Sequence, residues 1–269
     1  MKQNINGLDL WVEQGGSDAD GGSGAPTLLL MHGAGCVAGV WDGLVDILEN
    51  KWPGNWIVPD LRGHGRSDHA DDYSVGHLAA DMASLLRDTG KVVICAHSMG
   101  GLIAMALATG MYGVDVKHAI AIGTKISFTD EELAQTLKRA EMPNRLFDTR
   151  DDAIERFLLV SGLTGLVDPG SDVAASGVLE DSGGFRLAAD MRGALIAKSA
   201  YTEELYAAAS AHTHVVLAAG ENDAMVPIPQ LRELDPQGVE LIGLGHNAHV
   251  EDPEAVWKLI TNTIGMDHG

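Results

Sequence analysis

Three residues stand in the order and the settings that nucleophilic catalysis by a serine uses. Ser98 follows the apolar run VVICAH, Asp223 comes shortly after HVVLAAG, and His246 comes directly after VELIGLG. A serine hydroxyl is a weak nucleophile at neutral pH, so it needs a histidine base within hydrogen-bond reach and an acid that orients that base. The three residues therefore predict a serine nucleophile with its base and its acid.

Small residues surround Ser98 on both sides. The stretch AHSMGG, with Ala96 before the serine and Gly100 and Gly101 after it, matches the small-x-Ser-x-small pattern of a nucleophile elbow between a strand and a helix. Such an elbow strains the backbone so that the hydroxyl projects from the end of the strand, and bulky neighbours would clash there. A simple helix cap at Ser98 would not require small residues on both sides.

The elements that must position these residues follow from hydrophobic periodicity. Short apolar runs predict strands and longer amphipathic segments predict helices, in alternation, which indicates βαβ units and a mainly parallel sheet. The predicted strands cover 8–14, 27–31, 56–60, 91–97, 116–123, 214–220 and 239–244. The predicted helices that alternate with these strands or follow them cover 41–50, 74–90, 101–110 and 251–264. Because the carboxyl ends of parallel strands share one edge, Ser98, Asp223 and His246 are expected together.

The alternation stops between about residues 128 and 211. Helices are expected there at 129–142, 150–162 and 201–211, with no confident strand. We therefore predict a core domain of residues 1–127 and 212–269 and a helical cap of residues 128–211, placed to act as a lid. The Gly-, Ser- and Asp-rich stretch 14–26 predicts a flexible loop between two strands.

A dinucleotide-binding loop is the first alternative. Gly33, Gly35 and Ala38 satisfy G-x-G-x-x-[GA] after a strand, and Asp60 ends the next strand, where an acid can bind a ribose hydroxyl. However, Asp60 runs into the tight loop LRGHGRSD, where Arg62 and Ser67 are expected to stabilise the loop. This alternative also leaves the 92–101 stretch and the C-terminal histidines unexplained.

Five motifs in order give the chain a more specific likeness. MHGAG, PDLRGHGRSD, AHSMGG, GENDAMVP and GHNAHVEDP resemble those of the α/β-hydrolase superfamily, in its capped esterase, lactonase and C–C hydrolase branch. The resemblance covers nearly the whole chain outside the cap. It implies an α/β fold with a mostly parallel eight-stranded sheet flanked by helices, and a helical cap inserted after the sixth strand.

The same resemblance implies roles for the three residues. Ser98 is expected to be the nucleophile, His246 the general base and then acid, and Asp223 the orienting carboxylate. Glu221 competes as the acid, but Asp223 holds the position of the family pattern. His249 competes as the base, but the family places the base directly after a glycine, and His249 is expected to be a pocket wall or a structural residue.

Two backbone amides are expected to form the oxyanion hole. By the family pattern these belong to Met99, directly after the nucleophile, and to Ala34, in the loop after the third strand. Gly33 and Gly35 let this loop approach a substrate closely, and we place both in the substrate-binding site. His97 is assigned to the same site. It is not expected to be the base, because the elbow turns its side chain away from the serine hydroxyl.

Composition excludes several classes of partner. The net charge of −20 and the absence of any apolar run of about 18 residues argue against nucleic-acid, anionic-membrane and membrane-spanning functions. The N-terminus has no apolar signal region, so a soluble cytoplasmic protein is expected.

Cys36 and Cys95 are expected to be packing residues. His212 and His214 would share one side of an extended strand, but no further ligand completes a zinc site, and neither a metal nor a cofactor is expected.

The predicted activity is a serine hydrolase that cleaves a small to medium carboxylic ester or lactone through an acyl-enzyme on Ser98. The cap stretch FLLVSGLTGL is expected to line an apolar pocket, and five arginines in or near the cap offer either a carboxylate site or surface charge: Arg145, Arg150, Arg156, Arg186 and Arg192. One alternative is a C–C bond hydrolase of a diketone, because MHGAGCVAGVW resembles the oxyanion loop of that class. A second alternative is a non-enzymatic small-molecule receptor, and the oligomeric state is left open.

Overall fold

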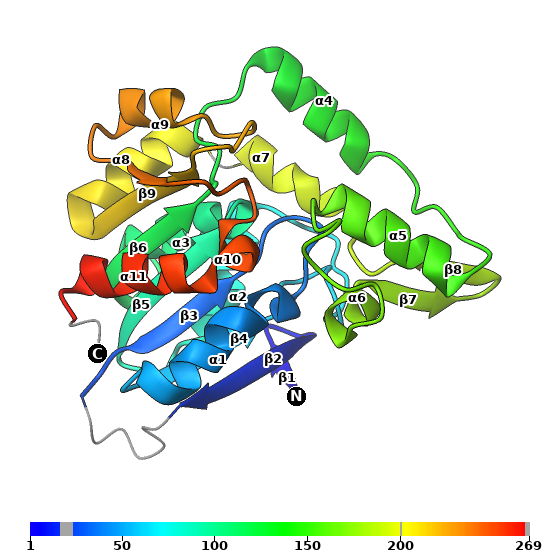
Figure 1. Cartoon of the computed structure of the whole chain (residues 1–269), viewed down its shortest axis with the longest axis horizontal. Helices are drawn as coiled ribbons and strands as arrows, with labels where there is room; N and C mark the ends of the chain where they lie inside the picture. The colour runs from blue at the N-terminus through cyan, green and yellow to red at the C-terminus, as the bar shows by residue number, and fades with distance from the viewer. Residues whose placement is uncertain (17–23, 200, 267–269) are drawn as a thin grey trace.

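An eight-stranded, mostly parallel sheet forms the centre of the molecule (Figure 1). The computed structural model describes residues 1–16, 24–199 and 201–266, so residues 17–23 of the predicted 14–26 loop lie outside the described residues. The strands run in the order β1-β2-β4-β3-β5-β6-β9-β10. They are β1 (Lys2–Ile5), β2 (Leu8–Gly16), β3 (Thr27–Met31), β4 (Asn55–Pro59), β5 (Lys91–His97), β6 (Asp115–Ile122), β9 (His214–Gly220) and β10 (Val239–Leu241).

The pairing of the strands confirms the predicted fold class. β1 pairs with β2 and β2 with β4 in antiparallel register, and every other pair in this sheet is parallel. All five residues of β3 are buried, because helices cover both faces. Successive side chains alternate between the faces, so Leu28 and Leu30 pack in one hydrophobic cluster and Leu29 and Met31 in the other.

Helices cover both faces of the sheet. In Figure 1, α1, α10 and α11 lie in front of the sheet, and α2 and α3 lie behind it. α3 is buried along its whole length, because its sequence MGGLIAMALA carries no polar side chain. The helices before β6 and from residue 202 onward are η1 (Ala38–Trp41), α1 (Asp42–Lys51), α2 (Val75–Leu85), α3 (Met99–Ala108), α8 (Thr202–His212), α9 (Ile228–Leu234), α10 (Ala248–Glu251) and α11 (Pro253–Ile264).

The chain between β6 and α8 lies beside the carboxyl edge of the sheet (Figure 1). It contains α4 (Asp130–Ala140), α5 (Arg150–Val160), α6 (Asp172–Ser176), β7 (Val178–Asp181), β8 (Gly184–Leu187), η2 (Met191–Leu195) and α7 (Ile196–Ser199). The sequence predicts no confident strand in this segment, whereas the structure has one antiparallel hairpin there, formed by β7 and β8. Gly183 and Gly184 supply the positive φ angles of its turn, 103° and 154°. The division into core and cap stays a prediction.

Two sets of hydrogen bonds tie this segment to the rest of the molecule. Asp190 donates its amide to the carbonyl of Gly63 at 2.7 Å and accepts the hydroxyl of Tyr73 at 2.8 Å. On another side, Asn247 donates its side-chain amide to the carbonyls of Ser161 and Gly162, just after α5. α8, which the predicted cap includes, packs against α3 of the core.

Candidate active site

The backbone of Ser98 is strained at the turn between β5 and α3. Its φ of 50° and ψ of −115° lie where non-glycine residues are rare, at about 1–3 kcal/mol of strain. Three hydrogen bonds hold this conformation. The amide of Ser98 donates to the carbonyl of Ile122 at 2.8 Å, and the carbonyl of Ser98 accepts the amide of Gly101 at 2.9 Å and the hydroxyl of Thr124 at 3.0 Å. The elbow is thus fastened to β6 on one side.

Close packing explains the small residues around Ser98. A Cβ atom on Gly100 would lie 2.7 Å from the carbonyl oxygen of Met31 in β3. A Cβ atom on Gly101 would overlap the side chain of Thr124, and one on Gly33 would lie 3.1 Å from the Cβ of Ser98. The sequence pattern therefore reflects contacts of the elbow with β3, with the residue that follows β6, and with the Gly33 loop.

His246 and Asp223 form a hydrogen-bonded pair. His246 Nδ1 lies 2.9 Å from Asp223 Oδ2, and Asp223 Oδ1 accepts the amides of Met225 and Val226 at 2.8 and 3.1 Å. Burial alone would raise the pKa of Asp223, but the hydrogen bonds from His246 and the two amides outweigh it and lower that pKa. Because an ionised carboxylate only accepts, the proton of neutral His246 lies on Nδ1 and its Nε2 keeps a lone pair.

The pair lies next to the elbow and remains open to solvent on one side. A Cβ atom on Gly123, which follows β6, would lie 3.2 Å from His246 Nδ1 and 3.3 Å from Asp223 Oδ2, so this glycine makes room for both side chains. The side chain of His246 is 21% exposed. Ser98 Oγ makes no hydrogen bond to any described residue, so no other partner restrains its rotation.

The loop after β3 forms a tight turn beside Ser98. The amide of Cys36 donates to the carbonyl of Gly33 at 3.2 Å, and Gly35 has a φ of 77°, which a type II turn requires at its third position. His32 anchors the loop: its Nδ1 donates to the carbonyl of Gly33 at 2.8 Å and its Nε2 accepts the amide of Leu61 at 3.0 Å. Burial lowers the pKa of His32 to about 4, so the ring is neutral.

The two predicted oxyanion amides have no hydrogen-bond partner within the described residues. Ala34 lies in the turn between Gly33 and Cys36, and Met99 begins α3, where the first amides of a helix lack intrahelical acceptors. The positive end of the α3 dipole also favours negative charge at this position. Their role in binding an oxyanion stays a prediction.

The alternatives to Asp223 and His246 lie in different surroundings. Glu221 is exposed and accepts the amide of Gly243 at 2.8 Å. His249 is fully buried, with its ring against those of Trp41 and His97, and burial lowers its pKa to about 3. Neither residue is paired as His246 and Asp223 are.

The placement of His97 differs from that of an exposed pocket residue. Its side chain is buried, and its Nε2 lies 3.0 Å from the carbonyl oxygen of His246. Burial, with the nearby His249 and His246, holds the pKa of His97 well below its ordinary value. The assignment of His97 to substrate binding stays a prediction.

Asp60 has a structural role, which differs from the ribose binding that the dinucleotide alternative gives it. Asp60 is completely buried, with Oδ1 accepting the amide of Ala38 at 2.6 Å and Oδ2 accepting the amide and Nε of Arg66 at 2.9 and 3.0 Å. Ser67 Oγ donates to the Asp60 carbonyl, and Arg62 donates twice to Asp81. Asp60 thus ties η1 to the loop after β4.

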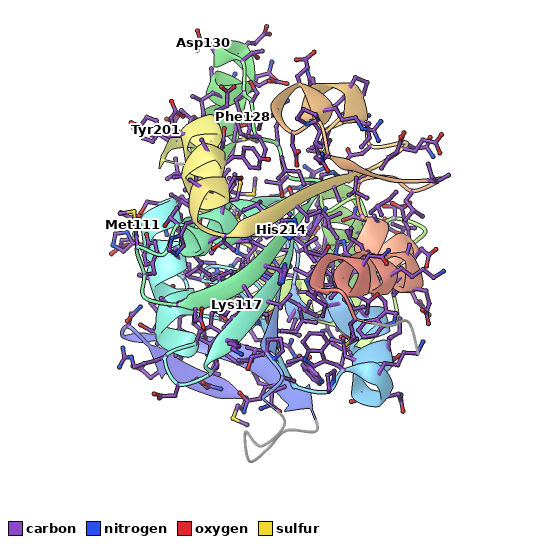
Figure 2. All side chains as sticks on the ribbon, turned by 90° about the vertical axis from the view of Figure 1, so that its left-hand side faces the viewer. Met111, Lys117, Phe128, Asp130, Tyr201 and His214 are labelled. Carbon is purple, nitrogen blue, oxygen red and sulfur yellow. The ribbon has the colours of Figure 1, made fainter. Side chains whose placement is uncertain are left out.

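The expectation that His212 and His214 share one side of a strand is wrong. His212 ends α8, while β9 begins at His214, so the helix end turns the two side chains into different surroundings. His214 instead meets His118 of β6, with 3.1 Å between the Nδ1 atoms, away from the α4 end of the molecule marked by Asp130 (Figure 2). No group of three or more metal-ligating side chains occurs within the described residues.

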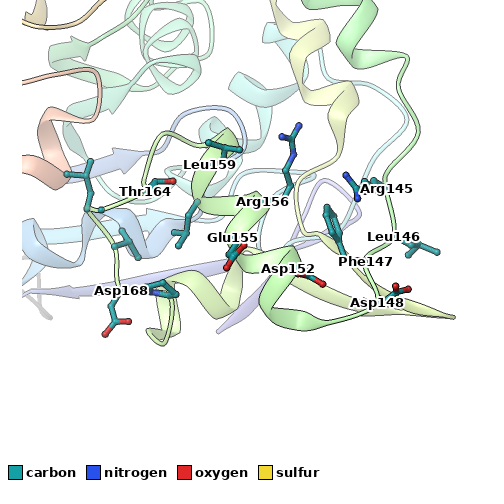
Figure 3. A pocket seen from close by; sticks show the side chains of 15 residues that line it. Arg145, Leu146, Phe147, Asp148, Asp152, Glu155, Arg156, Leu159, Thr164 and Asp168 are labelled. Atoms are coloured by element: carbon teal, nitrogen blue, oxygen red, sulfur yellow. The ribbon is translucent and has the colours of Figure 1, made fainter.

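Several hollows adjoin the cap segment, and two of them concern the predicted site. A cavity of about 340 Å³ is lined by Thr124, Lys125, Ile126, Met225 and Val226 among others, but by none of the predicted triad residues. A larger hollow of about 1070 Å³ runs along α5 and its flanking loops, and none of the predicted triad residues lines it (Figure 3).

The cap residues predicted to line an apolar pocket are divided between two places. Phe157, Leu158 and Leu163 are buried in a hydrophobic cluster, and Leu158, Leu159 and Leu166 line the larger hollow. None of the five lines the cavity beside Thr124.

The cap arginines have varied surroundings. Arg186 pairs with Asp181, and Arg192 pairs with Asp190. Arg150 donates to the carbonyl of Ala175. Arg145 lies over Phe147, and both Arg145 and Arg156 line the larger hollow.

Three residues that contact the site were not assigned from the sequence. Thr124 donates to the carbonyl of Ser98, Glu251 accepts the amide of Gly245 at 2.6 Å, and Asn247 links the residue after His246 to the cap segment. Glu251 and Asn247 both lie in GHNAHVEDP, so the motif carried a signal for these two residues. The contact partners of Thr124 and Asn247 lie in distant segments, so no local pattern indicated those contacts.

Comparison with known proteins decides the family. A sequence model described as the alpha/beta hydrolase family matches residues 28–259. The chain belongs to the alpha/beta hydrolase family. No helix within the described part of this hydrolase is long and apolar enough to cross a membrane.

Curated relatives of this alpha/beta hydrolase match different shares of it. An uncharacterized protein of Mycobacterium tuberculosis is 43% identical over 90 residues, 32% of this chain, and the match spans only 26% of that protein. The pimeloyl-[acyl-carrier protein] methyl ester esterase of Pseudoalteromonas atlantica is 27% identical over 223 residues, 77% of this chain and 79% of that enzyme. Among solved structures, E-2-(acetamidomethylene)succinate hydrolase superposes with a TM-score of 0.79 at 24% identity, covering 98% of both chains, which bears on the fold.

Proposed function

We propose that this alpha/beta hydrolase is a serine hydrolase that cleaves a small to medium carboxylic ester or lactone. The observation that carries the proposal is the strained elbow at Ser98 beside the hydrogen-bonded pair of His246 and Asp223. A serine with positive φ at the end of a central strand, next to a histidine whose Nδ1 is bound by a carboxylate, is the arrangement that acyl transfer needs. The segment 128–211 serves as the cap over this site.

Acylation follows from the state of each group. Ser98 Oγ attacks the carbonyl carbon while His246 Nε2 takes the hydroxyl proton, and Asp223 stabilises the imidazolium that forms. The amides of Ala34 and Met99 donate to the oxyanion of the tetrahedral intermediate. When the intermediate collapses, the carbon–oxygen bond to the leaving group breaks, and His246 returns its proton to the departing alkoxide. The product of this half-reaction is an acyl-enzyme ester on Ser98.

Deacylation repeats the steps with water as the nucleophile. His246 Nε2 takes a proton from the water molecule as its oxygen attacks the acyl carbon, and the same two amides hold the second oxyanion. Collapse breaks the bond to Ser98 Oγ, which recovers the proton from His246. No cofactor takes part, since every proton is returned and no electron is transferred.

A further observation favours a carboxylic ester as the substrate. The relative that aligns over 77% of the chain is a methyl ester esterase, and its name supports carboxylic ester chemistry for this chain.

A substrate screen with two variants tests the proposal. Wild type, Ser98→Ala and the control Ser210→Ala, a surface serine on α8, are assayed on p-nitrophenyl esters of increasing acyl length, on lactones and on a dienone diketone. We expect ester turnover by the wild type and the control, and a fall in kcat of at least about 10⁴-fold for Ser98→Ala. Full ester turnover by Ser98→Ala would refute the mechanism, and turnover of the diketone alone would favour the C–C hydrolase.

A fluorophosphonate probe gives an independent readout. The probe should label Ser98 in the folded wild type, as located by peptide mass mapping, and labelling should be lost when Asp223 is changed to Asn. A folded wild type that stays unlabelled at Ser98 would favour the receptor alternative.

A further inference from the structure

The loop that carries His246 is held at two points outside the pair with Asp223. His97, directly before the nucleophile, binds the carbonyl of His246 at 3.0 Å. Asn247, directly after His246, binds the carbonyls of Ser161 and Gly162 at 3.2 and 3.1 Å. One contact therefore reaches the elbow and the other reaches the end of α5 in the cap segment.

The chemistry of His97 fixes the direction of its contact. A backbone carbonyl can only accept, so His97 must carry its proton on Nε2 and donate it. Burial, together with the neighbouring His249 and His246, keeps the pKa of His97 well below its ordinary value, so its ring is neutral with a single proton. That one proton is committed to the carbonyl of His246, and the unprotonated Nδ1 of His97 is buried with no hydrogen-bond partner among the described residues.

The ring of His97 is held by its neighbours. Its centroid lies 4.7 Å from that of His246, edge to face, and 4.4 Å from that of His249. Only 2% of His97 is exposed. A Cβ atom on Gly33 would lie 2.8 Å from His97 Nδ1, so the oxyanion loop limits movement of the ring toward Ser98. The Nε2 donor is thus aimed at His246 by packing.

Asn247 makes the contact with the cap. Its side chain is 3% exposed, and both neighbouring groups are carbonyls, so the amide nitrogen must face them. The carbonyls of Ser161 and Gly162 follow the end of α5, where main-chain acceptors lack intrahelical donors. A Cβ atom on Gly162 would lie 2.9 Å from Asn247 Nδ2, so the fit is close. A shift of α5 must therefore act on the residue next to His246.

We propose that His97 and Asn247 are positioning residues for His246, with His97 fastening the base to the elbow and Asn247 fastening it to the cap. This inference rests on the proposed function. It makes the cap position a determinant of how His246 meets Ser98, so the residues act on the rate of acylation rather than on substrate affinity. A misplacement of about 1 Å can lower a rate by on the order of 100-fold.

The Asn247 contact is tested from its own side by Asn247→Ala. We expect kcat to fall by roughly 10- to 100-fold with KM within about threefold of wild type, and the rate of fluorophosphonate labelling to fall in parallel. The control is Tyr73→Phe, which removes a different hydrogen bond between core and cap, from Tyr73 to Asp190, away from His246. Equal losses in kcat for the two variants, or no loss in Asn247→Ala, would overturn the role of Asn247.

The same contact is tested from the cap by a matched pair of glycines. Gly162 and Gly165 lie in one loop with φ angles of 70° and 80°, so alanine strains both backbones alike. Only at Gly162 does the new Cβ press on Asn247, because nothing lies within 4 Å at Gly165. We expect Gly162→Ala to lower kcat about 10-fold more than Gly165→Ala. The same kcat in both would contradict the coupling.

His97 is tested by rescue. Gln carries an amide nitrogen at a reach similar to that of Nε2, whereas Phe keeps the ring shape and has no donor. We expect His97→Gln to keep kcat within about fivefold of wild type and His97→Phe to lose roughly 10- to 100-fold, with similar labelling yields after full reaction. Equal activity of the two variants would refute the donor role. Ser98→Ala distinguishes a failure of this inference from a failure of the proposed function, because full turnover without Ser98 would refute the proposed function itself.

Discussion

Asp223 holds His246 with one oxygen and two backbone amides with the other. The Oδ2 of Asp223 lies 2.9 Å from His246 Nδ1, and its Oδ1 accepts the amides of Met225 and Val226. The two amides hold the carboxylate of Asp223 in place, and this carboxylate in turn holds the orientation of the His246 ring. With its pKa lowered, Asp223 is ionised at neutral pH, so its carboxylate can only accept the hydrogen bond from His246 Nδ1.

Replacing Asp223 by Asn is therefore expected to impair catalysis without unfolding the protein. An amide can donate to Nδ1 and favour the wrong tautomer of His246, so kcat should fall by about 10³- to 10⁴-fold. The matched control is Glu221→Gln, two residues earlier on the exposed side, with kcat within about twofold of wild type. A loss in Glu221→Gln as large as that in Asp223→Asn would transfer the role of the acid to Glu221.

Gly33→Ala is expected to disturb the elbow from the opposite loop. The new Cβ would lie 2.8 Å from His97 Nδ1 and 3.1 Å from the Cβ of Ser98, so the loop or the elbow must move. We expect kcat/KM to fall on the order of 10- to 100-fold on the preferred ester. Gly76→Ala, in α2 with its nearest neighbour 3.6 Å away, should raise stability by about 0.5–1 kcal/mol and leave kcat/KM unchanged. Unchanged kinetics in Gly33→Ala would contradict the close contact.

Stability is expected to fall steeply in mild acid, because buried histidines stay neutral in the folded protein. The pKa values of His32, His64 and His249 fall to about 4, 3 and 3 through burial, and that of His97 lies well below the ordinary value. Unfolded histidines take up protons near pH 6.5, so the unfolded chain binds more protons below that pH and is favoured as the pH falls. Each group lowers the free energy of unfolding by about 1.4 kcal/mol per pH unit.

One carboxyl group acts in the opposite direction. Burial raises the pKa of Asp42 to about 6, so the folded state holds this proton first and gains stability as the pH falls. Four histidines less one carboxyl leave a net slope of about 4 kcal/mol per pH unit between about pH 5.5 and 4. Urea unfolding from about pH 7.5 to 4.5 measures this slope, and His249→Phe should reduce it by about a third, whereas His77→Gln on the surface should not. Equal slopes for His249→Phe and wild type would refute the assignment of this pH dependence of stability to buried histidines.

The sheet and its site edge could be predicted because the strands are buried on both faces. β3, β5 and β9 have the predicted limits, since continuous apolar runs end where the chain reaches polar residues. The small residues around Ser98 predicted the elbow for the same physical reason that the structure displays, the lack of room beside β3 and Thr124.

Short and partly exposed elements could not be predicted in this way. β7 and β8 have four residues each and few buried side chains, so no alternation marked them, although the turn residues Ser182, Gly183 and Gly184 were a usable signal. The contact of Asn247 with Ser161 joins segments 86 positions apart. Such contacts depend on the final packing of the cap, which no local pattern encodes.

Thr124→Val tests how much the elbow depends on β6. Valine keeps the shape of this buried residue but removes the hydroxyl that donates to the carbonyl of Ser98 at 3.0 Å. We expect a loss of about 1 kcal/mol in the free energy of unfolding. If that bond also holds the direction of Ser98, kcat should fall by up to about fivefold, the rate equivalent of the same energy. Thr263→Val removes a comparable bond to the carbonyl of Leu259 in α11, far from the site, and should lower stability without changing kcat. A kcat for Thr124→Val that matches Thr263→Val would limit Thr124 to a role in stability.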